Sequence, residues 1–325
     1  MDQTKNVFSG PEAIAKFFDP DANPMIPLVE LPPDMNPYAK RGIRIFAKLM
    51  YFVPLLNIKS VMAWSMLLDA QAKHQLGEDV TIVENSSGNT AISFGIMGKS
   101  LGVKKVVAFV PKDIAPGKLE LLRLAGVEVK MVNPGEKGGI EQAREATRYD
   151  GFFNPGQYHN ETNIQAHYKW TGRQIWEQTE GKISLFCTGL GTTGTALGVK
   201  SFLRQQGSNA AVIGVIVEDG NAIPGVRTRK RLEEISFDWE PGLDFTVEMN
   251  AKESYRQSLA LFRHGLMAGP SSGFALAGLL KFLESQPDLE RFRNVDGEVL
   301  AVFVCPDSPY LYSEKYSTIL DSEDF

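Results

Sequence analysis

The sequence has few of the residues that build disulfide frameworks or metal sites. It contains only two cysteines, Cys187 and Cys305, and both lie in apolar, strand-like runs. Each is therefore expected to be a small buried hydrophobic residue. The four histidines show no metal-ligand spacing with cysteine or with one another. The sequence thus predicts neither a disulfide framework nor a metal site.

Long apolar runs and an excess of positive charge are also missing. The longest uncharged run, 183–199, is rich in glycine and threonine and is interrupted by turn signals, so no membrane span is expected there. The formal net charge of -5 gives no reason to expect nucleic acid or an anionic membrane as a partner. The first ten residues have no apolar segment typical of a signal peptide. We therefore expect a cytoplasmic protein that acts on a small molecule.

Length and patterning predict an α/β protein. A chain of 325 residues suggests two domains at roughly 100–200 residues each. Strand-like segments alternate with helix-like segments, which indicates parallel sheets covered by helices on both faces. The strand-like segments are 43–52, 80–85, 104–111, 127–133, 183–189, 210–218 and 298–306. The helix-like segments are 60–76, 86–98, 116–126, 140–149, 162–179, 195–206 and 272–285.

Three polar, glycine-bearing loops occupy the places where such sheets bind ligands. Ligands bind at the carboxyl ends of parallel strands, where loops lead into helices. The loops are SSGNT (86–90), GLGTTGT (189–195) and GPSSG (269–273). Each is a candidate site loop.

The GLGTTG loop matches GxGxxG between a strand and a helix, and this match alone is weak. Glycines let the backbone approach an anion, and the first N–H groups of the helix point at it. Three threonines suit a terminal phosphate, whereas Glu218, 24 residues after Gly194, suits the ribose of a dinucleotide such as NAD. A tight turn without a ligand is the third interpretation, and the local sequence leaves all three open.

Two further features also have a structural and a functional interpretation. The SSGNT loop could cap a helix, because serine and asparagine are favoured there, or it could hold a carboxylate. Lys59 lies among apolar residues at a helix start. A lysine in such a place usually extends its charged end to water, and this is the favoured interpretation of Lys59 alone. A Schiff-base lysine is the functional alternative, because desolvation makes the amine more nucleophilic.

Taken together and in this order, the loops resemble the cysteine synthase family, which includes cystathionine β-synthase and forms the β-family of pyridoxal-phosphate (PLP) enzymes. The resemblance runs from PLVELP (27–32) to CPDS (305–308). SSGNT resembles the T-S-G-N-T loop of that family, and GLGTTGTALG resembles its phosphate loop. QYHNETNIQAHY (157–168), IPGVR (223–227) and GLMAGPSSGFALA (265–277) resemble further family segments.

The resemblance implies a role for each matched residue. Lys59 matches the lysine that forms the internal aldimine and carries the Cα proton, Asn89 the residue bound to the ring hydroxyl, and Ser271 the residue facing the ring nitrogen, with Ser272 as the weaker candidate. The phosphate cradle would comprise Gly191, Thr192, Thr193, Gly194 and Thr195. The substrate carboxylate would be held by Ser86, Ser87, Thr90 and Gln157. A serine cannot supply a full proton to the ring nitrogen, so rapid loss of a β-substituent is the expected chemistry.

The implied fold is that of a fold-type II PLP enzyme, similar to the tryptophan synthase β chain, with two doubly wound α/β domains and mostly parallel sheets. The smaller domain would cover 60–156, and the larger would combine 1–59 with 157–325. The implied reaction is β-replacement on O-acetyl- or O-phospho-L-serine through an α-aminoacrylate, by a sulfur or amine nucleophile. The alternatives are β-elimination or deamination, an NAD-dependent oxidoreductase, and a non-catalytic homologue. A homodimer is expected.

The chain departs from the family pattern around Lys59. The family commonly reads N-P-G-G-S-V-K-D-R, whereas residues 53–61 read VPLLNIKSV. Leucines thus replace both glycines, and the Asp-Arg pair after the lysine is missing. Thr193 replaces a usual glycine, as in relatives that make diaminopropionate precursors from O-phosphoserine. The basic residues Arg227 and Arg229 follow IPGV, and they are candidate ligands for such a phosphate.

Overall fold

The computed structural model describes residues 6–133 and 138–325. The chain divides into two compact units, one comprising Met1–Pro24 and Val53–Asn163 and the other Met25–Phe52 and Ile164–Phe325. The first unit therefore includes residues up to Pro24, 53–59 and 157–163, which the sequence prediction placed in the larger domain, whereas 25–52 lie in the second unit as predicted. The residues before Pro24 pack against the rest of this unit, since the ring centroids of Phe18 and Trp64 are 5.8 Å apart.

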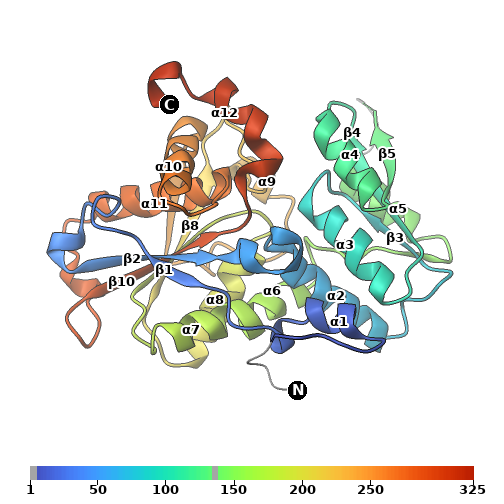
Figure 1. The fold of residues 1–325 in the computed structure, drawn as a ribbon, viewed down its shortest axis with the longest axis horizontal. Coiled ribbons are helices and arrows are strands. Elements are labelled where there is room, and N and C mark those ends of the chain that lie inside the picture. Colours follow the sequence, from blue (N-terminus) through green and yellow to red (C-terminus); the bar gives the residue numbers. More distant parts are fainter. Residues whose placement is uncertain (1–5, 134–137) are drawn as a thin grey trace. The chain divides into compact units, whose positions relative to one another are not determined.

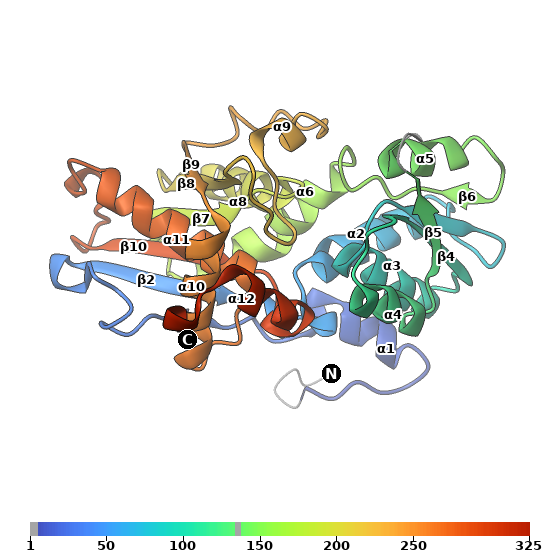
Figure 2. The ribbon, with the colours of Figure 1, turned by 90° about the horizontal axis from the view of Figure 1, so that it is seen from above.

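The first unit contains a four-stranded parallel sheet with the strand order β5-β4-β3-β6. Helix α5 lies on one side of the sheet, and α3 and α4 lie on the other (Figure 2). Gly95 lets α3 approach the sheet closely, because a Cβ there would lie 2.5 Å from Val127 Cγ2. The strands are β3 (Thr81–Glu84), β4 (Lys105–Pro111), β5 (Glu128–Val132) and β6 (Phe152–Phe153). The helices are α1 (Ala13–Phe18), α2 (Lys59–Ala72), α3 (Asn89–Ser100), α4 (Pro116–Leu124) and α5 (Gly139–Ala146).

The second unit is a six-stranded sheet in the order β1-β2-β10-β7-β8-β9, in which only β1 runs antiparallel to its neighbour. Helices α10 and α11 cover one face, and α7 and α8 cover the other (Figure 1). The strands are β1 (Leu28–Glu30), β2 (Ile43–Leu49), β7 (Leu185–Gly189), β8 (Ala211–Val217), β9 (Phe245–Met249) and β10 (Val299–Cys305). The helices are α6 (Thr162–Ala166), a π-helix (His167–Gly172), α7 (Arg173–Gln178), α8 (Gly194–Gln205), α9 (Arg229–Leu232), α10 (Ala251–Arg263), α11 (Pro270–Ser285) and α12 (Ser313–Ile319).

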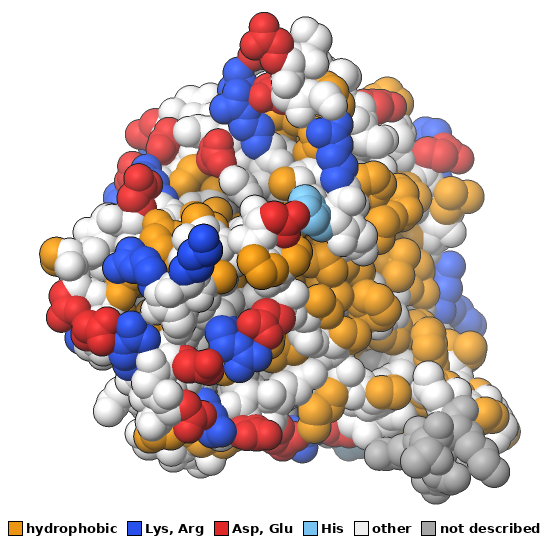
Figure 3. All heavy atoms as spheres, turned by 60° about the vertical axis from the view of Figure 1, so that its left-hand side comes forward, with side chains coloured by type: hydrophobic (Ala, Val, Ile, Leu, Met, Phe, Trp, Pro, Cys, Tyr) orange, Lys and Arg blue, Asp and Glu red, His pale blue; other side chains and the backbone are white. Residues whose placement is uncertain are grey.

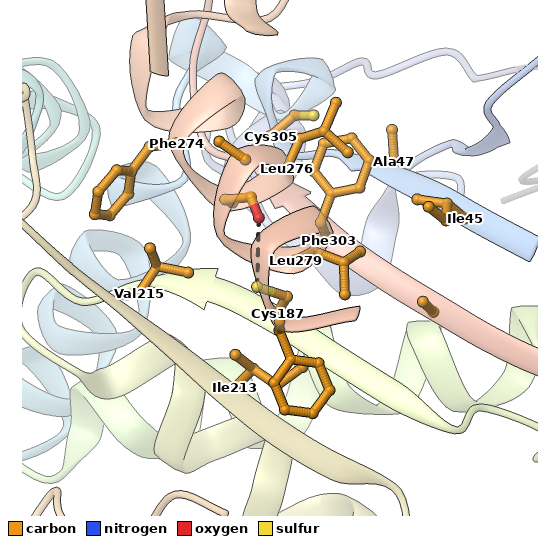
Figure 4. Close-up of a cluster of buried hydrophobic side chains, with 14 of the residues drawn as sticks. Ile45, Ala47, Cys187, Ile213, Val215, Phe274, Leu276, Leu279, Phe303 and Cys305 are labelled. Carbon is orange, nitrogen blue, oxygen red and sulfur yellow. Dashed lines mark hydrogen bonds between the residues drawn. The ribbon is translucent and has the colours of Figure 1, made fainter. Parts of the chain in front are cut away.

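The core of the second unit lies between its central strands and α11. Side chains from β2, β7, β8 and β10 meet those of α11, and Cys187 and Cys305 are among them (Figure 4). The Cys187 thiol donates to the carbonyl of Ala275 at 3.4 Å, and burial raises the pKa of both thiols. Both cysteines are free and buried, as the sequence predicts.

The strand order creates a switch point in the second unit. From β7 the chain passes through α8 to β8 on one side, whereas β10 lies on the other side of β7. The loops that leave the carboxyl ends of β7 and β10 therefore diverge. Open α/β sheets bind ligands at such a point.

A buried lysine anchors the start of the second unit. Lys48 on β2 is fully buried, and its Nζ donates to the carbonyl of Ile26 at 2.8 Å and to Oε1 of Gln174 and Gln178 at 3.0 and 2.7 Å. Burial lowers the pKa of Lys48 to about 7. All three of these acceptors are neutral. Lys48 therefore connects the residues before β1 to α7 by hydrogen bonds and not by an ion pair.

The surface drawn in Figure 3 carries both charged and hydrophobic side chains. Side chains of both charges are interspersed on the face drawn in Figure 3, beside an area of hydrophobic side chains. Within residues 6–133 and 138–325, no helix has the length and apolar character needed to cross a membrane. The same residues contain no cluster of three or more His, Cys, Asp or Glu that could hold a metal ion.

Candidate cofactor and substrate site

The predicted site residues divide between the two units. The first unit holds Lys59, Ser86, Ser87, Asn89, Thr90 and Gln157, and the second holds Gly191, Thr192, Thr193, Gly194, Thr195, Arg227, Arg229 and Ser271. The SSGNT and GLGTTGT loops follow the carboxyl ends of β3 and β7, as predicted from the sequence. The third loop, GPSSG, does not follow a strand, because it joins α10 to α11.

In the first unit, the SSGNT loop joins β3 to α3. The N-cap of α3 is Gly88, and it has no side chain to cap the helix. Ser86 Oγ accepts from the Gly88 N–H at 3.3 Å, and Ser87 and Asn89 are half-buried beside it. The interpretation of this loop as a simple serine or asparagine cap is therefore wrong.

Gln157 and Thr90 meet at a buried carboxyl group that the sequence analysis missed. Thr90 Oγ1 donates to Gln157 Oε1 at 3.3 Å, and Gln157 Nε2 donates to Glu84 Oε1 at 2.7 Å. All three residues are buried. Burial raises the pKa of Glu84 to about 7, and its Oε2 has no hydrogen-bond partner among the described residues. The only feature of the sequence that could have pointed to Glu84 is that a charged residue ends the strand TIVE.

A small cavity lies beside Glu84. Its lining includes Asn85, Arg144, Gln157 and His159, and it has space for about one water molecule. Burial is the main cause that lowers the pKa of His159, followed by the charge of Arg144. Polar side chains thus line a cavity next to the Glu84 carboxyl group, which accepts the hydrogen bond from Gln157 Nε2.

Lys59 is the first residue of α2, and it is half-buried. The turn before it is fixed by Asn57, whose Nδ2 donates to the carbonyl of Leu55 at 2.6 Å. Ser93 Oγ on α3 donates to Asn57 Oδ1 at 3.4 Å, and Ser60 Oγ donates to the Asn57 carbonyl at 2.8 Å. These bonds tie the start of α2 to α3.

The two leucines that replace the family's glycines keep a backbone conformation that favours glycine. Leu55 has a φ of 67° and Leu56 a φ of 55°. The left-handed conformation costs an L-residue with a Cβ about 1–2 kcal/mol. Both leucines thus adopt a conformation that costs stability.

Replacing Leu56 by glycine should make the protein more stable. Leu56 is 59% exposed, so little burial is lost, and the left-handed strain is relieved. The greater conformational entropy of glycine in the unfolded chain offsets part of this stabilisation. The free energy of unfolding should therefore rise by about 1 kcal/mol. Urea unfolding of Leu56→Gly and of the control Leu56→Ala, which keeps the Cβ, measures the effect. Equal stability of the two variants would contradict the strain argument.

In the second unit, the GLGTTG loop joins β7 to α8. Thr193 is the N-cap of α8 and has a φ of 66°. It is 3% exposed, and its Oγ1 has no hydrogen-bond partner among the described residues. A buried hydroxyl without a partner at the N-terminus of a twelve-residue helix fits an anion that supplies the missing bond. The donors present here therefore fit a phosphate group.

Behind this loop, His167 supports Thr195. Its Nε2 lies 3.2 Å from Thr195 Oγ1, and its Nδ1 lies 3.0 Å from Thr171 Oγ1. His167 opens the π-helix, and such turns are frequent at functional sites. Gly198 lets α8 lie close to the backbone of α6, because a Cβ at this position would lie 2.4 Å from the Ile164 carbonyl oxygen. The sequence analysis gave His167 no role.

The two adjacent serines at the start of α11 have different surroundings. Ser271 Oγ donates to Asp307 Oδ1 at 3.3 Å, just beyond the carboxyl end of β10. Ser272 is fully buried, and its Oγ has no hydrogen-bond partner among the described residues. Ser271 therefore shares the carboxyl edge of the sheet with the phosphate loop, since β10 pairs with β7.

The two arginines proposed as phosphate ligands are held by glutamates. Arg227 Nη1 donates to Glu234 Oε2 at 2.7 Å, and Arg229 pairs with Glu240 and lies 4.0 Å from Glu248. Glu218, the candidate ribose ligand of the dinucleotide interpretation, lies 3.7 Å from Lys281 Nζ. A ligand that binds these arginines has to compete with carboxylates already in place.

Comparisons with known proteins show the family of this chain. The family described as "Pyridoxal-phosphate dependent enzyme" matches residues 22–295. The chain belongs to this family. Cysteine synthase B of Escherichia coli is 30% identical over 273 residues, which cover 82% of this chain and 86% of that protein. The predicted cofactor, PLP, and the predicted membership among the cysteine-synthase-type enzymes are thereby confirmed.

Solved structures of relatives share the fold. The cysteine synthase of Entamoeba histolytica has a TM-score of 0.78 at 24% identity, covering 91% of this chain and 89% of that one. O-ureido-L-serine synthase has a TM-score of 0.77 at 25% identity, covering 91% and 93%. The predicted fold class, a fold-type II PLP enzyme with mostly parallel sheets, is confirmed. The interpretation of GLGTTG as an NAD site is wrong, because this family binds PLP.

Proposed function

We propose that this chain replaces the β-substituent of an activated L-serine, O-acetyl- or O-phospho-L-serine, with a sulfur or amine nucleophile. The observation that carries the proposal is the buried Thr193 hydroxyl at the N-terminus of α8, which has no partner among the described residues and would fit a phosphate group, in an enzyme of the cysteine synthase type. Cysteine synthase and O-ureido-L-serine synthase are named for products that differ only in the group on the β-carbon. A shared β-replacement reaction accounts for both names.

The resemblance to cysteine synthases implies the following role for each matched residue. Lys59 would bind it covalently and carry the proton of the substrate Cα. Asn89 would bind its ring hydroxyl, and Ser271 would face its ring nitrogen. The phosphate would be bound by Gly191, Thr192, Thr193, Gly194 and Thr195. When bound, PLP supplies an electron sink next to the Cα of the amino acid.

The substrate carboxylate would bind at the SSGNT loop, through Ser86, Ser87, Thr90 and Gln157. The hydroxyls and the first N–H groups of α3 can donate to a carboxylate, and the helix dipole favours a negative charge there. Gln157 is held in place by Thr90 and Glu84. The amino acid would thus be fixed by its carboxylate while Lys59 acts at Cα.

Product analysis tests the reaction directly. The holoenzyme is incubated with O-acetyl-L-serine or O-phospho-L-serine, with and without sulfide or a primary amine. β-Replacement predicts cysteine or a diaminopropionate-type product only when the nucleophile is present. Pyruvate and ammonia formed at the same rate with and without it would establish β-elimination instead. No release of acetate or phosphate from a PLP-loaded protein would support the non-catalytic alternative.

The arginines after IPGV would select O-phosphoserine as the donor. Phosphoserine carries about two negative charges near neutral pH, and a guanidinium can bind two of its oxygens at once. We expect Arg227→Ala or Arg229→Ala to raise the KM for O-phosphoserine by on the order of tenfold to a hundredfold, and that for O-acetylserine much less. Lys230→Ala is the matched control, because Lys230 is exposed in the same turn. Equal effects on both donors would exclude this role.

The chain would act as a homodimer in the cytoplasm. This part of the proposal rests on the resemblance to cysteine synthases. Sedimentation equilibrium of the holoenzyme should give twice the mass of the 325-residue chain. The mass of a single chain at micromolar concentration would contradict it.

A further inference from the structure

A buried carboxyl group to which the proposed function gives no role of its own lies behind Gln157. Glu84 is the last residue of β3 and is 2% exposed. Its Oε1 accepts from Gln157 Nε2 at 2.7 Å, at the short end of the range for a hydrogen bond from nitrogen. Its Oε2 has no hydrogen-bond partner among the described residues. The side-chain bond that this part of the chain offers to Glu84 thus comes from a predicted substrate ligand.

Gln157 is also fixed by two other hydrogen bonds. Thr90 Oγ1 donates to Gln157 Oε1 at 3.3 Å, so both ends of the amide group are bound. Asn163 Nδ2 donates to the Gln157 carbonyl at 2.9 Å and so holds the main chain. All four residues belong to the first unit. The side chain of Gln157 is therefore held at the carboxyl end of β3, beside the SSGNT loop.

The bond to Glu84 uses one of the two hydrogens on Gln157 Nε2. An amide nitrogen carries two hydrogens, whereas an amide oxygen only accepts. Because Thr90 donates to the oxygen and Glu84 accepts one hydrogen, the second Nε2 hydrogen is the donor that remains for a ligand. The bond needs only a lone pair on Glu84 Oε1, which a carboxyl group offers in both of its protonation states. The arrangement therefore does not depend on the charge of Glu84.

We infer that Glu84 is a positioning residue for substrate recognition, which holds the Gln157 amide so that its remaining Nε2 hydrogen is available to the substrate carboxylate. The inference rests on the proposed function, in which Gln157 binds that carboxylate. Glu84 forms no covalent bond and transfers no proton in this role. Without its acceptor oxygen, the amide would be held by Thr90 alone and could rotate. The substrate carboxylate would then lose a charge-assisted hydrogen bond.

L-Alanine and ethylamine separate carboxylate recognition from the other contacts of the amino acid, because they differ only in the carboxylate. Their binding to the holoenzyme is titrated through the absorbance of bound PLP, without a nucleophile. Glu84→Met keeps a side chain of similar length but offers only a weak acceptor. We expect this variant to bind L-alanine roughly tenfold more weakly, the effect of one hydrogen bond to a charged group, and to bind ethylamine as the wild type does.

A conservative variant tests whether the acceptor is the cause. Glu84→Gln again offers an oxygen to Gln157 Nε2, so it should bind L-alanine as the wild type does. Alanine is unsuitable at this position, because water from an enlarged cavity beside Glu84 could accept the hydrogen bond. The inference is overturned if Glu84→Gln weakens L-alanine binding as much as Glu84→Met does. It is also overturned if Glu84→Met weakens the binding of both ligands equally, or of neither.

Gln157→Ala separates this inference from the proposed substrate site. If Glu84 acts through Gln157, then Gln157→Ala and the Gln157→Ala/Glu84→Met double variant should bind L-alanine equally. If Gln157→Ala binds L-alanine as the wild type does, Gln157 is not a carboxylate ligand, and that part of the proposed function fails. If Gln157→Ala weakens the binding of L-alanine but Glu84→Met does not, only the role of Glu84 fails.

The amide group can also be observed without any substrate. In the holoenzyme labelled with ¹⁵N in its glutamine side chains, the signal of Gln157 is the one that Gln157→Ala removes. The bond to Glu84 should shift one of the two Nε2 hydrogens downfield. This shift should be lost in Glu84→Met and kept in Glu84→Gln. A Gln157 amide without a shifted hydrogen in the wild-type protein would overturn the inference with no change made at Glu84.

Discussion

Replacement of Lys59 by alanine should leave PLP bound without a covalent link and should slow the reaction by on the order of 10²–10⁴-fold, the usual contribution of a positioned proton carrier. Two functions are lost together, since the same amine would bind the cofactor and carry the Cα proton. The phosphate cradle lies in the other unit and is untouched, so cofactor should still be retained, now exchangeable by dialysis.

Borohydride reduction and peptide mapping check this prediction independently of activity. In the wild-type protein the phosphopyridoxyl group should be found on the peptide that contains Lys59, and in Lys59→Ala it should be absent. Lys73→Ala is the matched control, because Lys73 follows the same helix and its amine pairs with Asp69 on the surface. Label on any other lysine in the wild-type protein would show that Lys59 is not the attachment site.

The strands and the site loops could be predicted because their signals are local. Runs such as 210–218 and 298–306 are buried on both faces of a parallel sheet, so they read as continuous apolar segments. Two of the site loops, SSGNT and GLGTTGT, directly follow strands of the same kind, β3 and β7. β9 was missed for the opposite reason, because it is an edge strand with alternate residues partly exposed and carries a glutamate. The helical segment 162–179 was predicted as continuous, and its π-helical turn was not foreseen.

The hydrogen-bond partners of the site residues could not be predicted from the sequence. Gln157 and Glu84 are 73 residues apart, and Ser271 and Asp307 are 36 residues apart. Such contacts depend on which strand ends are adjacent, and no local pattern gives the strand order. The family resemblance gave a role to Gln157 and Ser271 but none to the carboxyl groups behind them.

Replacement of Glu84 by glutamine should remove a pH dependence of stability. Burial raises the pKa of Glu84 from its ordinary value of 4.5 to about 7, so the folded protein retains a proton that the unfolded chain loses. Its contribution to stability is therefore fully present below pH 4.5 and is lost as the pH rises to about 7. Over this window the loss amounts to about 3 kcal/mol. Glutamine stays neutral and keeps an acceptor for Gln157 Nε2.

Urea unfolding of wild type and Glu84→Gln between pH 4.5 and 8 measures this effect. The two proteins should have similar stability at the acid end, and the variant should be more stable by about 3 kcal/mol above pH 7. The difference between them isolates Glu84 from His159 and Lys48, which titrate in both proteins. A flat difference for Glu84→Gln would mean that the buried carboxyl group titrates as it does in the unfolded chain.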